Sequence, residues 1–413
     1  MVKGGRTLLR IKNLSLLLIL SLGLLAQRLP EQSFDKYPFI NQQADTVINA
    51  DKLKTFFSVL EKLKSTSEVS KLNIVHIGDS HIQGDFLTRE VRLNLQKNFG
   101  NGGRGLVFPY RLARSYEPKD IRSESKNQWI SARAFGSKRF PEPGISGYTV
   151  QSSDSLISFD LCTFNHDSLD YSFSKVSFIS HGDSTEYQVI ARDTIADENY
   201  SFISKGGDVS VCHLNKSTNQ LKFQSVKNNN AQNKLTVNGV VLENNQSGVV
   251  YHVVGVNGAH FSDYNKSPLL FQQLPFLHPD IILVSLGTNE GVNPRVTLVE
   301  IKQAVEELFK KISQNNPDVP VVLLTPFDNY YRNKSYNKYL GTVRSAIVEV
   351  AQLQNLPLID AYQITGGYSS CSQWRRFGLL RPDGIHYTQE GYTLQGEIIY
   401  QALINSYLKY AAH

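Results

Sequence analysis

The stretch Leu72-Asn-Ile-Val-His-Ile-Gly-Asp-Ser-His81 joins an apolar run to a sharp turn, and it decides the fold of the chain. The run is rich in β-branched residues, and the segment from Phe86 to Phe99 behind it has apolar residues at helical spacing. A strand, a glycine-containing turn and a helix place the Ser80 hydroxyl at the carboxyl edge of a parallel sheet, where open α/β folds bind ligands. The alternative is that Ser80 only caps the helix, because serine is a favoured N-cap residue.

A histidine and a carboxylate that suit this serine lie near the other end of the chain, in Asp383-Gly-Ile-His386. A loop containing Pro382 and Gly384 can turn the carboxylate onto one imidazole nitrogen while the other nitrogen faces the serine. Alone, the pair is more typical of a surface loop with a satisfied histidine. Together with Ser80 it supplies the components of acyl-transfer catalysis, and the sequence therefore predicts a hydrolase.

Acyl transfer also needs donors for an oxyanion, usually backbone N–H groups or an amide side chain. Two glycine-bearing turns at predicted strand ends offer them, Gly255–His260 and Ser285–Glu290. Gly258 would present an unobstructed N–H group, and Asn289 would present its amide. Both turns can equally be ordinary loops whose Gly and Asn residues serve left-handed backbone geometry.

Four short blocks, taken in order, resemble the signature blocks of the SGNH (GDSL-type) hydrolase family. They are Ser80 in Gly-Asp-Ser, Gly258 in Asn-Gly-Ala, Asn289 in Gly-Thr-Asn-Glu and His386 in Asp-Gly-Ile-His. The resemblance implies Ser80 as nucleophile, His386 as general base and acid, and Asp383 as the orienting carboxylate. The oxyanion hole would consist of the N–H groups of Ser80 and Gly258 and the side chain of Asn289. It further implies a flavodoxin-like three-layer α/β/α domain with a parallel sheet, and no cofactor.

Two departures from the common pattern narrow the resemblance. The first block continues Ser-His-Ile-Gln-Gly-Asp where many members have Ser-Leu, and the third block reads Asn-Glu where Asn-Asp is usual. Both features, and the glycine tract Phe99–Leu106, resemble the branch that contains bacterial peptidoglycan O-acetylesterases. The tract can equally be a flexible turn. The resemblance implies a serine esterase acting on an O-acetylated cell-wall glycan, with peptidoglycan first. The alternatives are another acetylated polysaccharide, acetyl transfer to a sugar, or an inactive glycan-binding surface protein.

The 413 residues, of which 41% are hydrophobic, exceed one usual domain and predict two structural units. Strands alternate with helices in 45–109 and 248–413, which predicts a split hydrolase domain with a parallel sheet. The expected elements are a helix at 51–63, strands at 72–77, 249–254, 280–286, 320–325 and 357–361, and helices at 86–99, 297–312, 336–353 and 390–408.

Between residues 110 and 247 the pattern changes to short alternating runs separated by polar turns, which predicts an inserted antiparallel β-sandwich, jelly-roll-like. A carbohydrate-binding role for this insert is one interpretation. Candidate sugar-stacking aromatics are Trp129, Tyr148, Phe135 and Tyr116, although rings of this kind more often fill a core or a domain interface.

The N-terminus has four basic residues before the apolar run Leu14–Ala26, the pattern of a secretory signal. Residues 1–26 are therefore predicted to be a signal peptide or a short membrane anchor, and no other membrane attachment is expected. The protein would be periplasmic, cell-surface or extracellular. Export to an oxidising compartment leaves open a disulfide between Cys162 and Cys212, while Cys371 would stay unpaired.

The formal net charge of +6 favours anionic cell-wall polymers over nucleic acid, since no basic cluster interleaved with aromatics is apparent. Arg375 and Arg376 lie upstream of the Asp383 loop and are candidates for contacting an anionic substrate, or they are solvated surface. No Cys/His spacing of a metal site is present, and no metal is expected.

Overall fold

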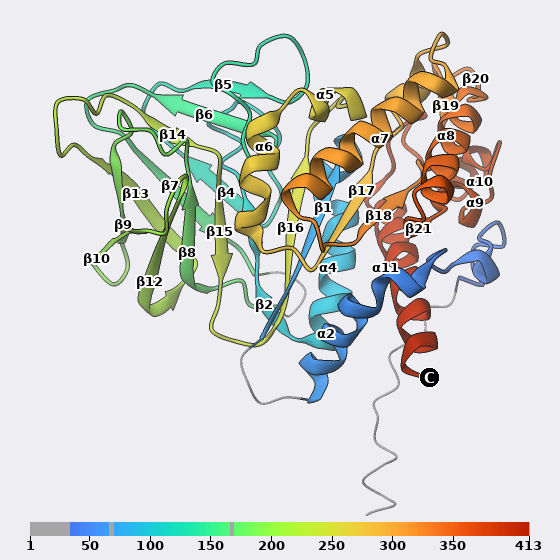
Figure 1. Ribbon diagram of the computed structural model, residues 1–413, viewed down its shortest axis with the longest axis horizontal. Helices are drawn as coiled ribbons and strands as arrows, with labels where there is room; N and C mark the ends of the chain where they lie inside the picture. The colour runs from blue at the N-terminus through green and yellow to red at the C-terminus, as the bar shows by residue number, and fades with distance from the viewer. Residues whose placement is uncertain (1–33, 66–69, 166–168, 413) are drawn as a thin grey trace, which may run out of the picture. The chain divides into compact units, whose positions relative to one another are not determined.

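The computed structural model describes residues 34–65, 70–165 and 169–412, and the predicted export segment 1–26 lies outside them. Six strands form one parallel sheet in the order β2-β16-β1-β17-β18-β21 (Figure 1). They are β1 (Lys71–Gly78), β2 (Asn101–Gly103), β16 (Gly248–Gly255), β17 (Ile281–Ser285), β18 (Val321–Leu324) and β21 (Leu358–Ile359). Without the edge strand β2, the chain order across the sheet is 2-1-3-4-5, the flavodoxin-like arrangement, which confirms the predicted fold class.

Helices cover both faces of this sheet, as the alternation along β1 requires. Val75 and Ile77 belong to an apolar core shared with α7 and α8, whereas Ile74, which precedes Val75 in the strand, points to the opposite face. The first group of helices comprises α5 (Phe261–Asn265), α6 (Pro268–Gln273), α7 (Leu298–Asn315) and α8 (Tyr339–Leu353). The second comprises α2 (Lys54–Ser65), α4 (Phe86–Phe99) and α11 (Gln389–Ala411).

The helix predicted to begin at Tyr336 begins instead at Tyr339. The residues before it form a small hairpin of β19 (Tyr330–Tyr331) and β20 (Ser335–Tyr336). Two further short helices follow β21, α9 (Ala361–Ile364) and α10 (Cys371–Arg376). The hairpin and α10 lie beside the loop that carries Asp383, as described below.

Antiparallel sheets account for most of the remaining strands, as predicted for the insert. One five-stranded sheet contains β4 (Ile121–Glu124), β7 (Ser158–Thr163), β13 (Gln220–Val226), β9 (Gln188–Asp193) and β10 (Glu198–Ser201). The other contains β3 (Gly105–Val107), β15 (Gly239–Glu243), β8 (Phe173–Ile179), β12 (Val209–Thr218) and β11 (Ile203–Ser204). A three-stranded sheet contains β5 (Ile130–Arg133), β6 (Tyr148–Ser152) and β14 (Leu235–Val237). The rings of Phe178 and Phe223, one from each large sheet, lie 5.9 Å apart, so the two sheets pack face to face.

The disulfide considered between Cys162 and Cys212 is not formed, and all three cysteines are free. Cys162 lies on β7 and Cys212 on β12, which belong to different sheets. Cys212 is buried in the apolar core, whereas Cys162 is half-buried on the alternating outer face of its strand. The Cys212 side chain therefore faces the core of the sandwich, and the Cys162 side chain faces its outer surface.

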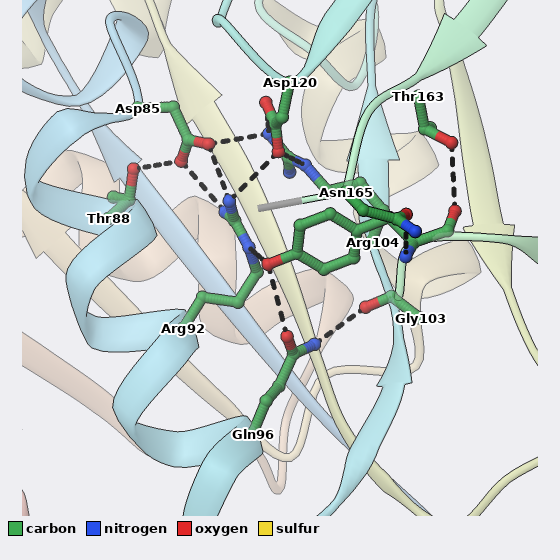
Figure 2. A network of polar contacts seen from close by, with 10 residues as sticks. Asp85, Thr88, Arg92, Gln96, Gly103, Arg104, Asp120, Thr163 and Asn165 are labelled. Carbon is green, nitrogen blue, oxygen red and sulfur yellow. Dashed lines mark hydrogen bonds and ion pairs between the residues drawn. The ribbon is translucent and has the colours of Figure 1, made fainter. Parts of the chain in front are cut away.

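A buried ion cluster ties α4 to the start of the insert (Figure 2). The Arg92 guanidinium contacts Asp85 at 2.8 Å and Asp120 at 3.3 Å, and Arg104 pairs with the same two carboxylates. All four side chains are almost fully buried. Burial acts to raise the pKa of Asp85, but Arg104 and Arg92 outweigh it and lower that pKa to about 2. Removing one member would leave a buried unpaired charge, at a cost of about 3–5 kcal/mol.

Candidate active site

Three loops that carry predicted site residues meet at the carboxyl edge of the parallel sheet. Ser80 follows β1, Gly258 follows β16 and Asn289 follows β17, and β1 lies between the other two strands. The order of strands reverses at this point, so a crevice between neighbouring loops is expected there. Ser80 is the first residue of α3 (Ser80–Gln83), and the N-cap is Asp79, whose carboxylate accepts from the His81 N–H at 3.0 Å. The capping role weighed for Ser80 is thus filled by its neighbour.

The structure brings Ser80, His386 and Asp383 into one chain of hydrogen bonds. Ser80 Oγ lies 3.1 Å from His386 Nε2, and His386 Nδ1 lies 3.0 Å from Asp383 Oδ2. The second carboxylate oxygen accepts the backbone N–H groups of Ile385 at 2.8 Å and His386 at 2.9 Å. A serine hydroxyl, an imidazole and a carboxylate are therefore each within hydrogen-bond reach of the next, the arrangement that nucleophilic catalysis needs.

Asp383 is held as an anion although it is partly exposed. Burial acts to raise its pKa, but hydrogen bonds from the backbone of Ile385 and His386 and from the imidazole outweigh it, and the pKa is lowered. The side chains of Asp383 and His386 are 48% and 35% exposed, so water reaches both. Gly384 turns the loop with φ of +75°, a conformation that glycine adopts at little cost.

A second imidazole, that of His81, packs against the ring of His386. The ring of His81 lies 5.3 Å from that of His386, and its Nδ1 lies 3.0 Å from the buried hydroxyl of Tyr392. Burial, together with the neighbouring His386, lowers the pKa of His81 to about 3. His81 is consequently neutral at physiological pH and packs against His386 without adding charge.

The oxyanion donors expected from the sequence differ in whether they already donate a hydrogen bond within the chain. Among the described residues, the N–H groups of Ser80 and Gly258 have no hydrogen-bond acceptor. The Asn289 amide donates to the Ala259 carbonyl at 2.9 Å and lies 3.3 Å from Asp79 Oδ2, beyond the best range for a hydrogen bond. One amide proton of Asn289 is thus committed to the neighbouring loop, and the other is weakly held. Burial raises the pKa of Asp79 to about 7.

Gln83 is a site residue that the sequence did not single out. Its Oε1 accepts the N–H of Asn257 at 2.8 Å, next to Gly258, and the hydroxyl of Tyr148 at 2.9 Å. Gln83 therefore fixes the loop that presents the Gly258 N–H group. The available signal was the continuation Ser-His-Ile-Gln of the first block, which departs from the common pattern.

The insert also reaches the site through Phe135. A methyl group on the α-carbon of Gly258, where φ is +81°, would lie 3.1 Å from the Phe135 ring. The same ring stacks on His260 with centroids 6.2 Å apart. Of the other candidate sugar-stacking aromatics, Tyr148 is buried, Trp129 packs on Phe159, and Tyr116 is exposed.

The two candidate arginines are placed differently. The Arg375 guanidinium donates to the Asn333 side chain at 2.7 Å and lies 4.1 Å from the centre of the Tyr330 ring. Arg376 is exposed, with no hydrogen-bond or ion-pair partner in the part of the chain that the structure describes. Arg375 thus supports the hairpin beside the Asp383 loop, and nothing brings Arg376 to Ser80.

Neither a metal-ligand cluster nor a membrane-spanning helix is found within 34–65, 70–165 and 169–412. No three His, Cys, Asp or Glu side chains converge there as ligands. No helix in these ranges combines the length and the apolar character needed to cross a membrane.

At the edge of the flavodoxin-like sheet the structure places a serine, a histidine and a carboxylate, the groups that a serine hydrolase uses. Residues 229–394 match the model of the GDSL-like Lipase/Acylhydrolase family. The matched range holds Gly258, Asn289, Asp383 and His386, whereas Ser80 lies before it, on the other side of the insert.

Three solved structures to which the chain is similar are the following. A structure described as a peptidoglycan O-acetylesterase aligns with a TM-score of 0.73 at 19% identity, covering 88% of this chain and 99% of that chain. A lipase/acylhydrolase from Enterococcus faecalis aligns with a TM-score of 0.30 at 22% identity, over 37% of this chain and 74% of that chain. A carbohydrate esterase family 3 protein from Talaromyces cellulolyticus gives 0.31 at 20% identity, over 39% and 72%. A search of curated proteins gives no match. The first of these likenesses extends over both the parallel sheet and the inserted sheets.

Proposed function

We propose that the chain is an exported serine esterase that removes O-acetyl groups from a cell-wall glycan, with peptidoglycan as the substrate. The observation that carries the chemistry is the hydrogen-bond chain from Ser80 Oγ through His386 to Asp383, at 3.1 and 3.0 Å. The choice of substrate is supported by the fold, which is shared over most of both chains with a peptidoglycan O-acetylesterase.

In the proposed reaction His386 Nε2 takes the proton of Ser80 Oγ as the oxygen attacks the acetyl carbonyl. The oxyanion accepts hydrogen bonds from the N–H groups of Ser80 and Gly258 and from the Asn289 amide. The intermediate collapses, the bond between the acetyl carbon and the sugar oxygen breaks, and His386 gives the proton to that oxygen, which leaves as the sugar hydroxyl. Water then attacks the acetyl-serine with His386 again as base. The bond to Ser80 Oγ breaks, His386 returns the proton to Ser80, and acetate leaves. Throughout, the Asp383 carboxylate accepts a hydrogen bond from His386 Nδ1–H, remains ionised and stabilises the imidazolium.

The exposure of the catalytic groups suits a polymeric substrate. Asp383 and His386 are about half and one third exposed, so an ester on a long strand reaches Ser80 without threading through a tunnel. The basic N-terminal region and the apolar run of the signal pattern support a location outside the cytoplasm, where such a polymer lies.

Acetate release from O-acetylated peptidoglycan and from acetylated xylan, measured side by side, tests the proposal. The purified chain is compared with Ser80→Ala and with Ser217→Ala, a matched exposed serine in β12. We expect release from peptidoglycan by the parent chain and by Ser217→Ala only. Equal release by Ser80→Ala would refute the nucleophile. A preference for xylan would keep the chemistry and refute peptidoglycan as the substrate.

A further inference from the structure

A cluster of five tyrosines lines a groove of about 630 Å³ beside the Asp383 loop. We call it the tyrosine surface, and its rings are those of Tyr330, Tyr331, Tyr336, Tyr339 and Tyr368. The rings pack against one another in pairs, with Tyr336 5.7 Å from Tyr330 and 5.9 Å from Tyr368. Tyr336 and Tyr368 are nevertheless 41% and 56% exposed. Large rings are unusual on a solvated surface, and a groove lined by them fits a ligand with apolar faces.

Unpaired cations surround these rings. Arg332, Lys334 and Lys338 are exposed, and none has a carboxylate partner among the described residues. Arg332 lies over the ring of Tyr331 at 5.1 Å, and Lys338 lies over that of Tyr339 at 5.5 Å. The segment 329–341 contains three basic residues and no acidic residue. Within the described residues no ion pair involves these three side chains, and the groove thus presents positive charge.

The tyrosine surface is joined directly to the catalytic loop. The Tyr330 N–H donates to the Gly384 carbonyl at 2.8 Å, and the Asn333 amide donates to the Pro382 carbonyl at 2.6 Å. Arg375 rests on the Tyr330 ring and bonds Asn333, which fixes the hairpin against the loop. The hairpin that carries the groove is therefore bonded to the loop whose Asp383 carboxylate contacts His386.

We propose that the tyrosine surface binds an anionic glycan strand and so provides the substrate subsites that flank Ser80. Tyrosine offers a flat ring for the apolar face of a sugar and a hydroxyl for its polar edge. The unpaired lysines and arginine recognise carboxylates carried by the strand, such as those of peptide-substituted sugars. The position of the strand relative to the scissile ester rests on the proposed function, whereas binding of the strand does not.

Binding is measured in a Ser80→Ala background, which removes turnover as a variable. The full chain is sedimented with purified peptidoglycan sacculi at low and high salt. One test variant combines Tyr336→Ala with Tyr368→Ala, and the other combines Lys334→Gln with Lys338→Gln. Matched controls are Phe164→Ala and Lys216→Gln, which remove an exposed ring and an exposed charge from the inserted sheets. Circular dichroism and thermal melting establish that every variant is folded.

We expect the apparent Kd for sacculi to rise by about tenfold in each test variant, the size expected when anchoring side chains are truncated. The controls should bind as the Ser80→Ala parent does, and salt should weaken the parent more than the lysine variant. Unchanged binding in both test variants overturns the inference. So does tighter retention of poly(dT) than of sacculi, or equal retention of neutral xylan at all salt concentrations.

Failure of the proposed function is distinguishable from failure of this surface. With Ser80 restored, the ratio of kcat/KM on O-acetylated sacculi to that on p-nitrophenyl acetate should fall about tenfold in the test variants. Sacculi binding that depends on the tyrosine surface, without acetate release by the parent chain, would refute the esterase and support the surface. Acetate release with a ratio equal to the parent's would refute the surface and leave the esterase intact.

Discussion

Replacing Asp383 by asparagine tests the part of the site that water reaches most easily. The Asp383 carboxylate lies 3.0 Å from His386 Nδ1 and accepts a hydrogen bond from it. It also accepts hydrogen bonds from two backbone N–H groups of its own loop. An asparagine keeps one oxygen for the backbone and turns its NH₂ group toward Nδ1. The imidazole must then carry its proton on Nε2, facing Ser80, and that tautomer cannot take the serine proton.

The expected loss follows from the exposure of the pair. In a fully buried triad the same exchange lowers kcat by about 10⁴-fold. Here the two side chains are 48% and 35% exposed, so water competes for Nδ1 and relaxes the tautomer preference. We therefore expect a decrease in kcat of about 10²–10³-fold, or roughly 3–4 kcal/mol in activation free energy. Asp383→Ala lets water accept the Nδ1 proton, and it should be at least as active as the asparagine variant.

Initial rates on p-nitrophenyl acetate separate kcat from KM for both variants, and thermal melting establishes that the loop is folded. We expect kcat to fall in both variants with little change in KM, because neither variant removes a group that touches the acetyl moiety. An asparagine variant that keeps more than about one tenth of the parental kcat would refute it. So would an alanine variant that is far less active than the asparagine variant.

Three further predictions follow from the same geometry. Asn289→Ala should lower kcat by about 10²-fold through loss of an oxyanion donor, and an unchanged single-turnover rate would remove Asn289 from the site. Gly258→Ala should lower the free energy of unfolding by about 1–3 kcal/mol, measured in urea, because its φ is +81° and its methyl group would press on Phe135. Asp45 is buried without a side-chain partner, and burial raises its pKa to about 8. The folded state keeps a proton that the unfolded state releases near pH 4, so its contribution to stability is lost as pH rises from about 4 to 8. Asp45→Asn should therefore flatten this fall and raise the free energy of unfolding at pH 9 by a few kcal/mol; identical pH profiles would refute the raised pKa.

The parallel sheet and the convergence of the strand-end residues could be predicted because each depends on a local pattern. Apolar runs give the strands, and turns that contain glycine follow them at the same edge of the sheet. Ser80, Gly258 and Asn289 each come directly after a strand, so adjacency of strands brings them together. The histidine was found through its own short loop with Asp383, in which both partners lie within four residues.

Contacts between segments that lie far apart in the sequence could not be predicted, because no local sequence pattern marks them. Gln83 bonds Asn257 across 174 residues, and nothing in the composition of either segment indicates the partner. The hairpin at Tyr330 was missed because its strands have two residues each, too few for a periodic pattern. The disulfide between Cys162 and Cys212 stayed open at the sequence level for a related reason: sequence spacing does not reveal that Cys212 faces the core while Cys162 faces outward.

Long-range contacts join the insert to two residues that closely follow Ser80. Tyr148 of the insert donates to Gln83, which in turn holds the loop of Gly258. Asp120 of the insert shares Arg92 and Arg104 with Asp85, five residues after Ser80 (Figure 2). Without the insert, two buried arginines would have one carboxylate between them, and a charge left buried and unpaired costs several kcal/mol. The inserted sheets therefore do more than extend the surface: they hold the residues that follow Ser80, and a change in their position would move the turn that carries Ser80 with them.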